Sequence, residues 1–261
     1  MNLKRIIGGL AWTVWRRDAD VYMVTWKTNV LPPLLEPFLF LAAFGAGLGS
    51  LINTVDWRGQ PYTYASFIAP GLIAAGVMNQ TFFENTFSTF VRLHYQKTFD
   101  ALLATPLTAG DIILGELLWG ATKGFFTGIV MLLVITGFGL MHYPTALGII
   151  PYCFLNGLMF AGLALCFTGR TTRIEAFNFP MYLLVSPMYV LSGTFFPLEI
   201  LPHWGQAIAW ALPLTHAAAA TREMALGRVT QGLAVSVAYT IAVTGVSCWL
   251  GFRWMKRRLF R

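Results

Sequence analysis

Residues 144–168 of the sequence, PTALGIIPYCFLNGLMFAGLALCFT, contain no charged side chain from one end to the other. A helix needs about 20 apolar residues to cross the hydrocarbon layer of a membrane. The run does not alternate polar with apolar residues, as a strand of a membrane barrel would. Because backbone polar groups in lipid must be satisfied inside the segment, the stretch predicts a transmembrane helix.

Similar apolar stretches lie on both sides of this one. Together they predict six membrane helices, at 29–52, 63–90, 111–140, 144–168, 174–194 and 230–252. The composition agrees, because only 11% of the residues are charged, against about a quarter in a soluble domain. No polar stretch is long enough for a separate soluble domain. We therefore expect residues 1–261 to form one all-α integral membrane domain, which argues against a stand-alone cytosolic enzyme.

The basic residues predict the orientation of these helices. If the N-terminus is cytoplasmic, fourteen of the 18 Lys and Arg residues lie on the cytoplasmic side, and Arg58, Arg222 and Arg228 lie outside. Since cytoplasmic loops carry the excess of Lys and Arg, both termini are predicted to be cytoplasmic. The net charge of +7 then indicates topology and contact with anionic membrane lipid. No nucleic-acid partner is expected.

Residues 1–27 precede the first predicted span. Leu3, Ile7, Leu10 and Val14 follow one stripe of a helix. With tryptophans and arginines beside this stripe, we expect a helix that lies in the cytoplasmic interface of the membrane. The alternative is a short cytoplasmic extension.

Residues 92–110 form the main predicted cytoplasmic connection. Phe99, Leu102 and Leu103 lie at helical spacing, and Thr105-Pro106 ends the helix because proline cannot continue it. A short amphipathic helix in this place either docks into the groove of a partner or rests on the bilayer surface. The residues alone leave both interpretations open.

Residues 194–229 form the predicted outer connection. They are apolar, but Pro197, Pro202 and Pro213 leave pieces too short to span. Short helices that enter the membrane and return fit better, because irregular backbone at that depth must be covered. The charged side chains here are Glu199, Arg222, Glu223 and Arg228, and the imidazoles are His203 and His216. The histidines lack the spacing of a zinc site, so no metal site is expected.

Four charged residues fall within predicted spans: Glu36, Glu84, Glu116 and Lys123. Charges in hydrocarbon are costly and often functional. Glu116 and Lys123 are seven residues apart, so they share a helix face, although about 10 Å of helix rise separates them. The charges form either a cytoplasmic gate that opens and closes or a static pairing that holds helices together.

Glycines recur every four residues in the third predicted span, at Gly120, Gly124 and Gly128. Small residues at this spacing let helix backbones approach closely in lipid. We expect this face to pack tightly against another helix.

Three stretches of the chain resemble the permease subunits of ABC-2 type ATP-binding-cassette exporters. Residues 99–120 (FDALLATPLTAGDIILGELLWG) are similar to the family's segment after the second span, and residues 29–49 (NVLPPLLEPFLFLAAFGAGLG) look like its first span. Residues 191–227 (LSGTFFPLEILPHWGQAIAWALPLTHAAAATREMALG) resemble its signature before the last span. Within the family the chain looks nearest to the nodulation-factor, or lipo-oligosaccharide, export permeases of the J type.

The resemblance implies a second permease subunit, in a homodimer, and two separate cytoplasmic ATPase subunits. It implies that the helix near 92–105 is a coupling helix that rides in a groove of the ATPase, with Arg92, His94, Lys97, Phe99, Asp100, Leu102, Leu103, Thr105 and Pro106 as its candidate residues. It also implies that short outer helices cap the exit of the pathway, with Pro197, Glu199, Pro202, Pro213, His216 and Arg222 as candidates.

The sequence contains no G-x-x-x-x-G-K-[ST] phosphate loop. We therefore expect this chain to bind no cofactor, while ATP and magnesium are used by the partner. The resemblance implies an exporter of the bacterial inner membrane that moves a lipo-oligosaccharide or lipid-linked glycan by alternating access. A permease for hydrophobic small molecules or drugs is the alternative. A membrane-embedded enzyme would need paired acids or a histidine site, and the acids here are scattered; a passive scaffold would not need a coupling segment.

Overall fold

The computed structural model describes residues 10–47 and 54–259. Its first half contains α1 (Ala11–Phe40), η2 (Leu41–Gly47), β1 (Val55–Trp57), β2 (Gln60–Tyr62), α2 (Tyr64–Phe83), η4 (Glu84–Ser88), η5 (Val91–Tyr95), α3 (Thr98–Leu103) and α4 (Ala109–Gly137). The second half contains η6 (Thr145–Gly148), α5 (Ile149–Thr168), η7 (Ile174–Phe177), α6 (Asn178–Pro180), η8 (Met181–Val185), α7 (Ser186–Leu191), η9 (Leu198–Ile200), α8 (His203–Ala211), α9 (Pro213–Ala225) and α10 (Gln231–Leu259).

Five helical segments of the described chain are long and apolar enough to cross a membrane. They are Tyr64–Tyr95, Ala109–Gly137, Thr145–Thr168, Ile174–Leu191 and Gln231–Leu259. Each coincides with one of the predicted spans. The remaining prediction, 29–52, is not among them: its described part is helical up to Gly47 and includes Glu36, and residues 48–52 lie outside the described chain. The six-span count stays a prediction.

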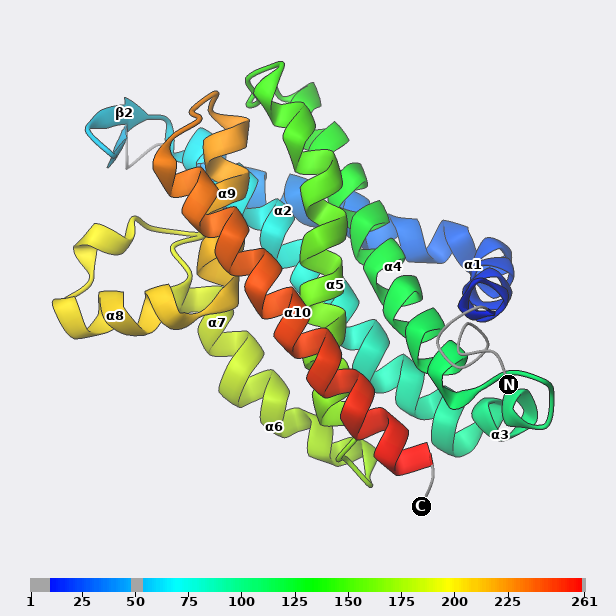
Figure 1. Cartoon of the computed structure of the whole chain (residues 1–261). Helices are drawn as coiled ribbons and strands as arrows, with labels where there is room; N and C mark the ends of the chain where they lie inside the picture. Colours follow the sequence, from blue (N-terminus) through cyan, green and yellow to red (C-terminus); the bar gives the residue numbers. More distant parts are fainter. Residues whose placement is uncertain (1–9, 48–53, 260–261) are drawn as a thin grey trace.

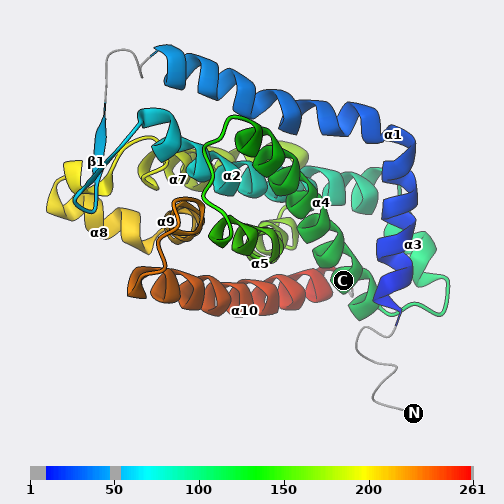
Figure 2. The same ribbon diagram turned by 90° about the horizontal axis from the view of Figure 1, so that it is seen from above.

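The N-terminal part of the chain differs from the prediction. Instead of a separate helix over 1–27 and a span from residue 29, α1 runs without a break from Ala11 to Phe40, because no helix-breaking residue separates the two. Residues 1–9, with Leu3 and Ile7 of the predicted stripe, lie outside the described chain. Figure 2 shows α1 bending through a large angle, so its two parts still point in different directions.

The all-α prediction needs a second correction, since a short antiparallel hairpin joins α1 to α2. β1 pairs with β2 in the register Val55 with Tyr62 and Trp57 with Gln60. The turn places Arg58 at φ 50° and Gly59 at φ 73°. Glycine adopts this left-handed conformation without steric cost, which suits it to a two-residue hairpin turn.

α2 lies at the centre of the bundle, against α4, α5 and α9. Figure 2 shows α1 along one side of this core and α10 along the opposite side. The predicted close packing of the glycine face on α4 is confirmed. A Cβ atom at Gly120 would collide with the Asn85 side chain, and one at Gly128 would lie 2.6 Å from the Sγ atom of Cys153.

The predicted cytoplasmic segments lie together at one end of the bundle. In Figure 1, α3, the turn between α5 and α6 and the last turns of α10 occupy the lower end, while the β hairpin and the turn after α4 occupy the upper end. Below, we call these the inner and outer ends. α4 begins at the inner end with a capping box, in which Thr108 and Asp111 satisfy each other's backbone N–H groups.

Candidate functional site

The helix that contains α2 changes its geometry near the inner end. Two π-helical turns, Glu84–Ser88 and Val91–Tyr95, interrupt it. Such turns insert an extra residue into the helix and are frequent at functional sites. Glu84 begins the first turn and Arg92 lies in the second, and both side chains point toward α4.

Four side chains form the inner charge network: Glu84, Arg92, Glu116 and Lys123. The Nε and Nη2 atoms of Arg92 donate to the two carboxylate oxygens of Glu116, at 3.1 and 2.6 Å. Its Nη1 atom donates to Oε1 of Glu84 at 2.8 Å, and Nζ of Lys123 donates to Oε2 of Glu84 at 2.8 Å. Arg92 therefore bridges two carboxylates, and every charge meets an opposite one.

Neighbouring groups hold the network in place. Trp119 donates its Nε1–H to Glu84, and the Thr89 hydroxyl donates to Glu116 at 2.6 Å. Both glutamates are almost fully buried, while the side chains of Arg92 and Lys123 are 13% and 12% exposed. A buried pair is strongly destabilised when one partner is removed, because the other charge stays behind without compensation. The network thus ties α2 to α4 tightly.

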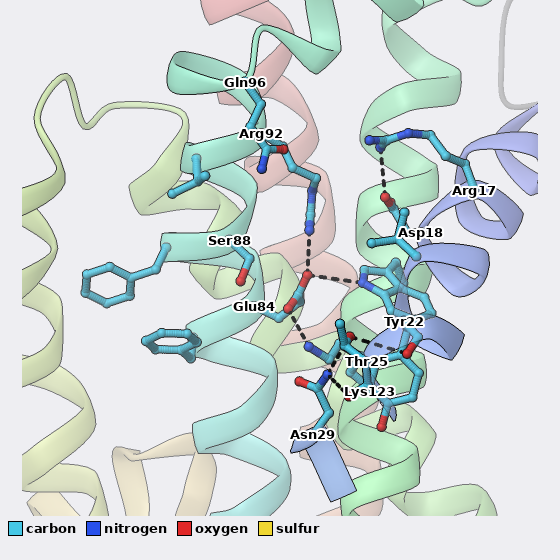
Figure 3. A pocket seen from close by; sticks show the side chains of 15 residues that line it. Arg17, Asp18, Tyr22, Thr25, Asn29, Glu84, Ser88, Arg92, Gln96 and Lys123 are labelled. Carbon is cyan, nitrogen blue, oxygen red and sulfur yellow. Dashed lines mark hydrogen bonds and ion pairs between the residues drawn. The ribbon is translucent and has the colours of Figure 1, made fainter. Parts of the chain in front are cut away.

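An open cavity of about 420 Å³ lies beside the network, between α1 and α2. Figure 3 shows Glu84 and Arg92 on one side of it and Asp18 and Tyr22 of α1 on the other, while Lys123 reaches Glu84 from α4. Phe83 and Phe87 also line it, and Phe83 is half exposed. The cavity therefore combines a charged wall with an aromatic one.

Asp18, with its neighbour Arg17, is a charged residue of this cavity that was not predicted from the sequence. Arg17 donates to its Oδ1 atom at 2.9 Å, while its buried Oδ2 atom has no hydrogen-bond partner in the described chain. Burial, with the negative charge of Glu116 as a further cause, raises the pKa of Asp18 to about 7. A carboxyl group with this pKa changes its charge near neutral pH.

The structure brings together three of the four predicted intramembrane charges. Glu36 is apart from them, half-buried on α1, and forms no ion pair within the described residues. Arg92, by contrast, was predicted to belong to the coupling segment but is part of the network. Its guanidinium points into the network because Arg92 lies on the last turns of a helix that continues to Tyr95. The predicted shared face of Glu116 and Lys123 is confirmed, since both reach the network from α4.

The predicted helix of the cytoplasmic connection is present as α3, Thr98–Leu103. Phe99 does not face a partner, because it is fully buried against Val14, Ile112 and Met255. Leu102 is half-buried. Both side chains anchor α3 to the bundle.

The other side of this segment is exposed. Its exposed side chains are His94, Lys97, Asp100, Leu103, Thr105 and Pro106. Lys97 and Asp100 approach at 3.9 Å with both side chains mostly in solvent, so this pair contributes little. The helix therefore has one face fixed to α4 and α10 and one face free for contact.

At the outer end, the prolines of the predicted segment lie where helices begin. Pro197 and Pro202 precede η9 and α8, and Pro213 is the first residue of α9. Proline is favoured at helix starts because its missing N–H is not needed there. Glu199 is exposed on η9. His216 is buried, stacks on Tyr239 at 3.8 Å and bonds the Trp210 carbonyl, which makes it structural.

Arg222 is the buried cation of the outer end, and backbone carbonyls surround it. Its Nε atom donates to the Phe67 carbonyl at 2.9 Å, and Nη2 donates to the Gly193 and Thr194 carbonyls at 2.8 and 3.3 Å. The guanidinium also lies over the Phe67 ring. Burial lowers the pKa of Arg222 to about 9, so it is still charged at neutral pH. We call this arrangement the Arg222 clamp.

The sequence analysis did not foresee the ion pair beside this clamp. Arg58, at the tip of the hairpin, meets the fully buried Glu223 at 2.5 Å, and the Thr230 hydroxyl donates to the same carboxylate. Arg58 and Glu223 are 165 residues apart, and no pattern in the sequence connects them. The left-handed Arg-Gly turn is the only local signal for the position of Arg58.

Comparison with known proteins gives matches over nearly the whole chain. Residues 9–226 match the family model described as "ABC-2 type transporter". The chain is 33% identical to nodulation protein J of Rhizobium leguminosarum bv. viciae, over 97% of each chain. It is 34% identical to nodulation protein J of Sinorhizobium fredii, over 94% of this chain and 92% of the relative. The inner membrane transport permease YadH of Escherichia coli is 26% identical over 82% of each chain.

Proposed function

The chain belongs to the ABC-2 type transporter family, as a multi-pass subunit of the bacterial inner membrane that is not itself the ATPase, and from this premise we propose how it works. A cytoplasmic ATPase moves α3, and α3 moves the helices that carry the inner charge network. A substrate with a polar and an apolar part then crosses by alternating access.

The two-sided burial of α3 carries this proposal. Phe99 is fully buried in a cluster with residues of α1, α4 and α10, whereas Asp100 and Leu103 are exposed. A segment that merely rested on a bilayer would not need an anchor in the protein core. A segment that transmits force needs both an anchor and a free face.

The position of α3 in the chain supports the same conclusion. It follows the helix of Arg92 and precedes the helix of Glu116, and these two residues are joined by a bidentate ion pair. Leu10, at the start of α1, donates its N–H to Asp111 at 2.9 Å. A displacement of α3 therefore acts on three helices at their inner ends.

The inner charge network is suited to a change between two states. Its pairs join side chains on different helices, and Glu84 has two cationic partners, so it is able to keep one while losing the other. A ligand shifts such an equilibrium only by binding one state better. Of the two interpretations left open by the sequence, we propose the gate, with static pairing as its resting state.

The cavity between α1 and α2 supports an amphipathic substrate. Charged and amide side chains line one part of it, and Phe83, Phe87 and Val21 line another. This mixture fits a lipid-linked oligosaccharide or lipo-oligosaccharide, the class that the resemblance implies. An export permease for hydrophobic small molecules is the second candidate, favoured by the aromatic wall alone.

The assembly that we propose has two copies of this chain and two ATPase subunits that use ATP and magnesium. Each copy has six spans, the first of them beginning near residue 29 in the second part of α1, with both termini in the cytoplasm and with η9 and α8 as short re-entrant helices. The exposed apolar side chains of α8, Trp204 and Ile208, support contact of this helix with lipid. α3 then lies in the cytoplasm.

The coupling role is tested by ATP turnover of the chain purified with its ATPase. Leu103→Ser combined with Asp100→Ala should lower the stimulation of hydrolysis at least about fivefold, as expected for loss of a docking contact worth over about 1 kcal/mol. Val229→Ser, another exposed apolar side chain, at the outer end, is the control. Unchanged stimulation in the double variant would remove the coupling role.

The orientation is tested by labelling a single introduced thiol from outside intact cells. Replacing the native Cys153, Cys166 and Cys248 by Ala provides the background. A cysteine at Val229 should be labelled, and one at Ala104, exposed beside α3, should not. The reverse result would place α3 on the wrong side for an ATPase.

A further inference from the structure

A basic cavity of about 370 Å³ lies at the inner end, between the turn after α5 and the last turns of α10. Arg170, Arg257 and Arg258 line it together with Trp254, Gly169, Thr171 and Thr172. None of these lining residues is acidic. None of the three arginines forms an ion pair with a described residue. In the inner charge network, by contrast, both cations are paired with a carboxylate.

The walls of this cavity are held firmly. The Arg170 guanidinium stacks on the Trp254 ring at 3.7 Å, and Arg258 donates to the Thr168 carbonyl. A Cβ atom at Gly169 would lie 2.8 Å from the backbone nitrogen of Met255, so the turn and α10 touch backbone to backbone. Arg170 and Arg258 are therefore fixed beside the cavity before any ligand binds, which lowers the entropy cost of binding.

An apolar stripe of α10 leads away from the cavity. Val246, Leu250 and Trp254 precede Arg257 at intervals of four, four and three residues, which keeps them on one helix face. Val246 is exposed, and Leu250 is half exposed. A ligand that fills both surfaces has an anionic head and a long apolar tail.

We propose that this cavity binds the phosphate of an anionic phospholipid, such as phosphatidylglycerol, with its acyl chains along the Val246–Trp254 stripe of α10. Arginine donates two parallel hydrogen bonds to phosphate oxygens, and basic pockets between membrane helices are suited to such head groups. An acidic surface of a protein partner would pair with the arginines but would leave the apolar stripe without a contact, so a lipid accounts for both features. The binding itself does not depend on the proposed transport function; only its assignment to the cytoplasmic leaflet rests on the proposed orientation.

The test measures lipid binding to the purified full chain by native mass spectrometry. The chain is titrated with phosphatidylglycerol, phosphatidylcholine or inorganic phosphate. Each arginine near a membrane surface contributes about fivefold in affinity. The double variant Arg170→Gln/Arg257→Gln should therefore bind phosphatidylglycerol about 25-fold more weakly and no better than phosphatidylcholine. The matched control is Arg253→Gln, which removes a cation of α10 that stacks on Trp249 outside the cavity.

Three results would overturn the proposal. The first is unchanged phosphatidylglycerol binding in the double variant or, if that variant does not fold, in Arg257→Gln alone, whose side chain is exposed. The second is equal binding of inorganic phosphate, which would show that the apolar stripe takes no part. The third is unchanged lipid binding with loss of the co-purified ATPase, which would assign the arginines to a protein contact. Transport activity enters none of these measurements.

Discussion

The inner charge network and the Arg222 clamp both bury an arginine between helices, but the two arginines are held in opposite ways. Arg92 is held by two carboxylates from different helices. Arg222 is held by backbone carbonyls of α2 and of the loop before η9, and forms no ion pair with a described residue. Side-chain pairs are able to exchange partners when helices shift, whereas a backbone contact fixes the loop that provides it. This difference is what the gate proposed for the inner end requires.

The strongest test of this contrast is Arg92→Ala. It leaves Lys123 paired with Glu84 and Glu116 buried without the cation that paired with it. Removing one partner of a buried ion pair costs about 3–5 kcal/mol, so we expect a larger loss of thermal stability in detergent than for any single substitution at the Arg222 clamp. The control is Asp100→Ala, which breaks a pair with Lys97 whose side chains are 64% and 65% exposed and should cost about 1 kcal/mol or less. Equal losses in the two variants would mean that the network is not a buried centre.

Arg222→Met should have a smaller effect, because it leaves no opposite charge behind. The carbonyls of Phe67 and Gly193 lose a donor, and an unsatisfied buried polar group costs about 1–3 kcal/mol. We expect a total loss near the upper end of that range, with faster hydrogen exchange of the loop at residues 192–197. A loss above that of Arg92→Ala would contradict the contrast between the two centres.

The contrast also explains what the sequence was able to predict. Glu84, Glu116 and Lys123 stand out because each interrupts an apolar run, and such interruptions are visible from composition alone. Arg92 does not stand out, because arginines are expected where a span meets the cytoplasm. Its inward direction depends on the π turns at Glu84–Ser88 and Val91–Tyr95, and these reflect packing against α4.

The outer end was harder to predict for a related reason. The prolines divide the segment into short helices, as predicted, because their effect on the backbone is local. The partners of Arg222 and Glu223 come from α2, the hairpin and the loop before η9, which are distant in sequence. Every residue has a backbone carbonyl, so the sequence does not indicate which carbonyls accept hydrogen bonds from an arginine. Arg222 therefore cannot be told from other arginines by its sequence context.

Two glycines, one beside the inner charge network and one beside the Arg222 clamp, allow a comparison of how tightly the two regions are packed. A Cβ atom at Gly120 would collide with Asn85, whose amide donates to the Glu116 carbonyl; at Gly71 it would lie 3.0 Å from Cγ2 of Thr194. Overfilling a packed interior costs about 1–3 kcal/mol. Gly120→Ala should therefore cost about 2 kcal/mol. Gly71→Ala should cost about 1 kcal/mol, because its added Cβ would also lie 3.1 Å from Cα of Thr194 and 3.2 Å from Nη2 of Arg222, distances that a small shift relieves. Gly245→Ala is the control, since no atom lies within 4 Å of its added Cβ. The reverse order of the first two would show that a methyl group is accommodated more easily beside the inner charge network than beside the Arg222 clamp.

The smallest effect concerns the pH dependence that Asp18 adds to the inner end. Its pKa of about 7 in the folded chain exceeds the ordinary value of about 3.9, so the folded state holds a proton that the unfolded state has lost. Stability must then fall as pH rises between these two values and level off above the higher one. Asp18→Asn should remove a decrease of about 1 kcal/mol between about pH 6 and about pH 7, measured as the difference between the two thermal-stability profiles. Asp20→Asn, at an exposed position of the same helix, should leave the wild-type profile unchanged. If Asp18→Asn and the wild type lose stability in parallel, the carboxyl group is ionised throughout this pH range, with Arg17 as its counter-charge.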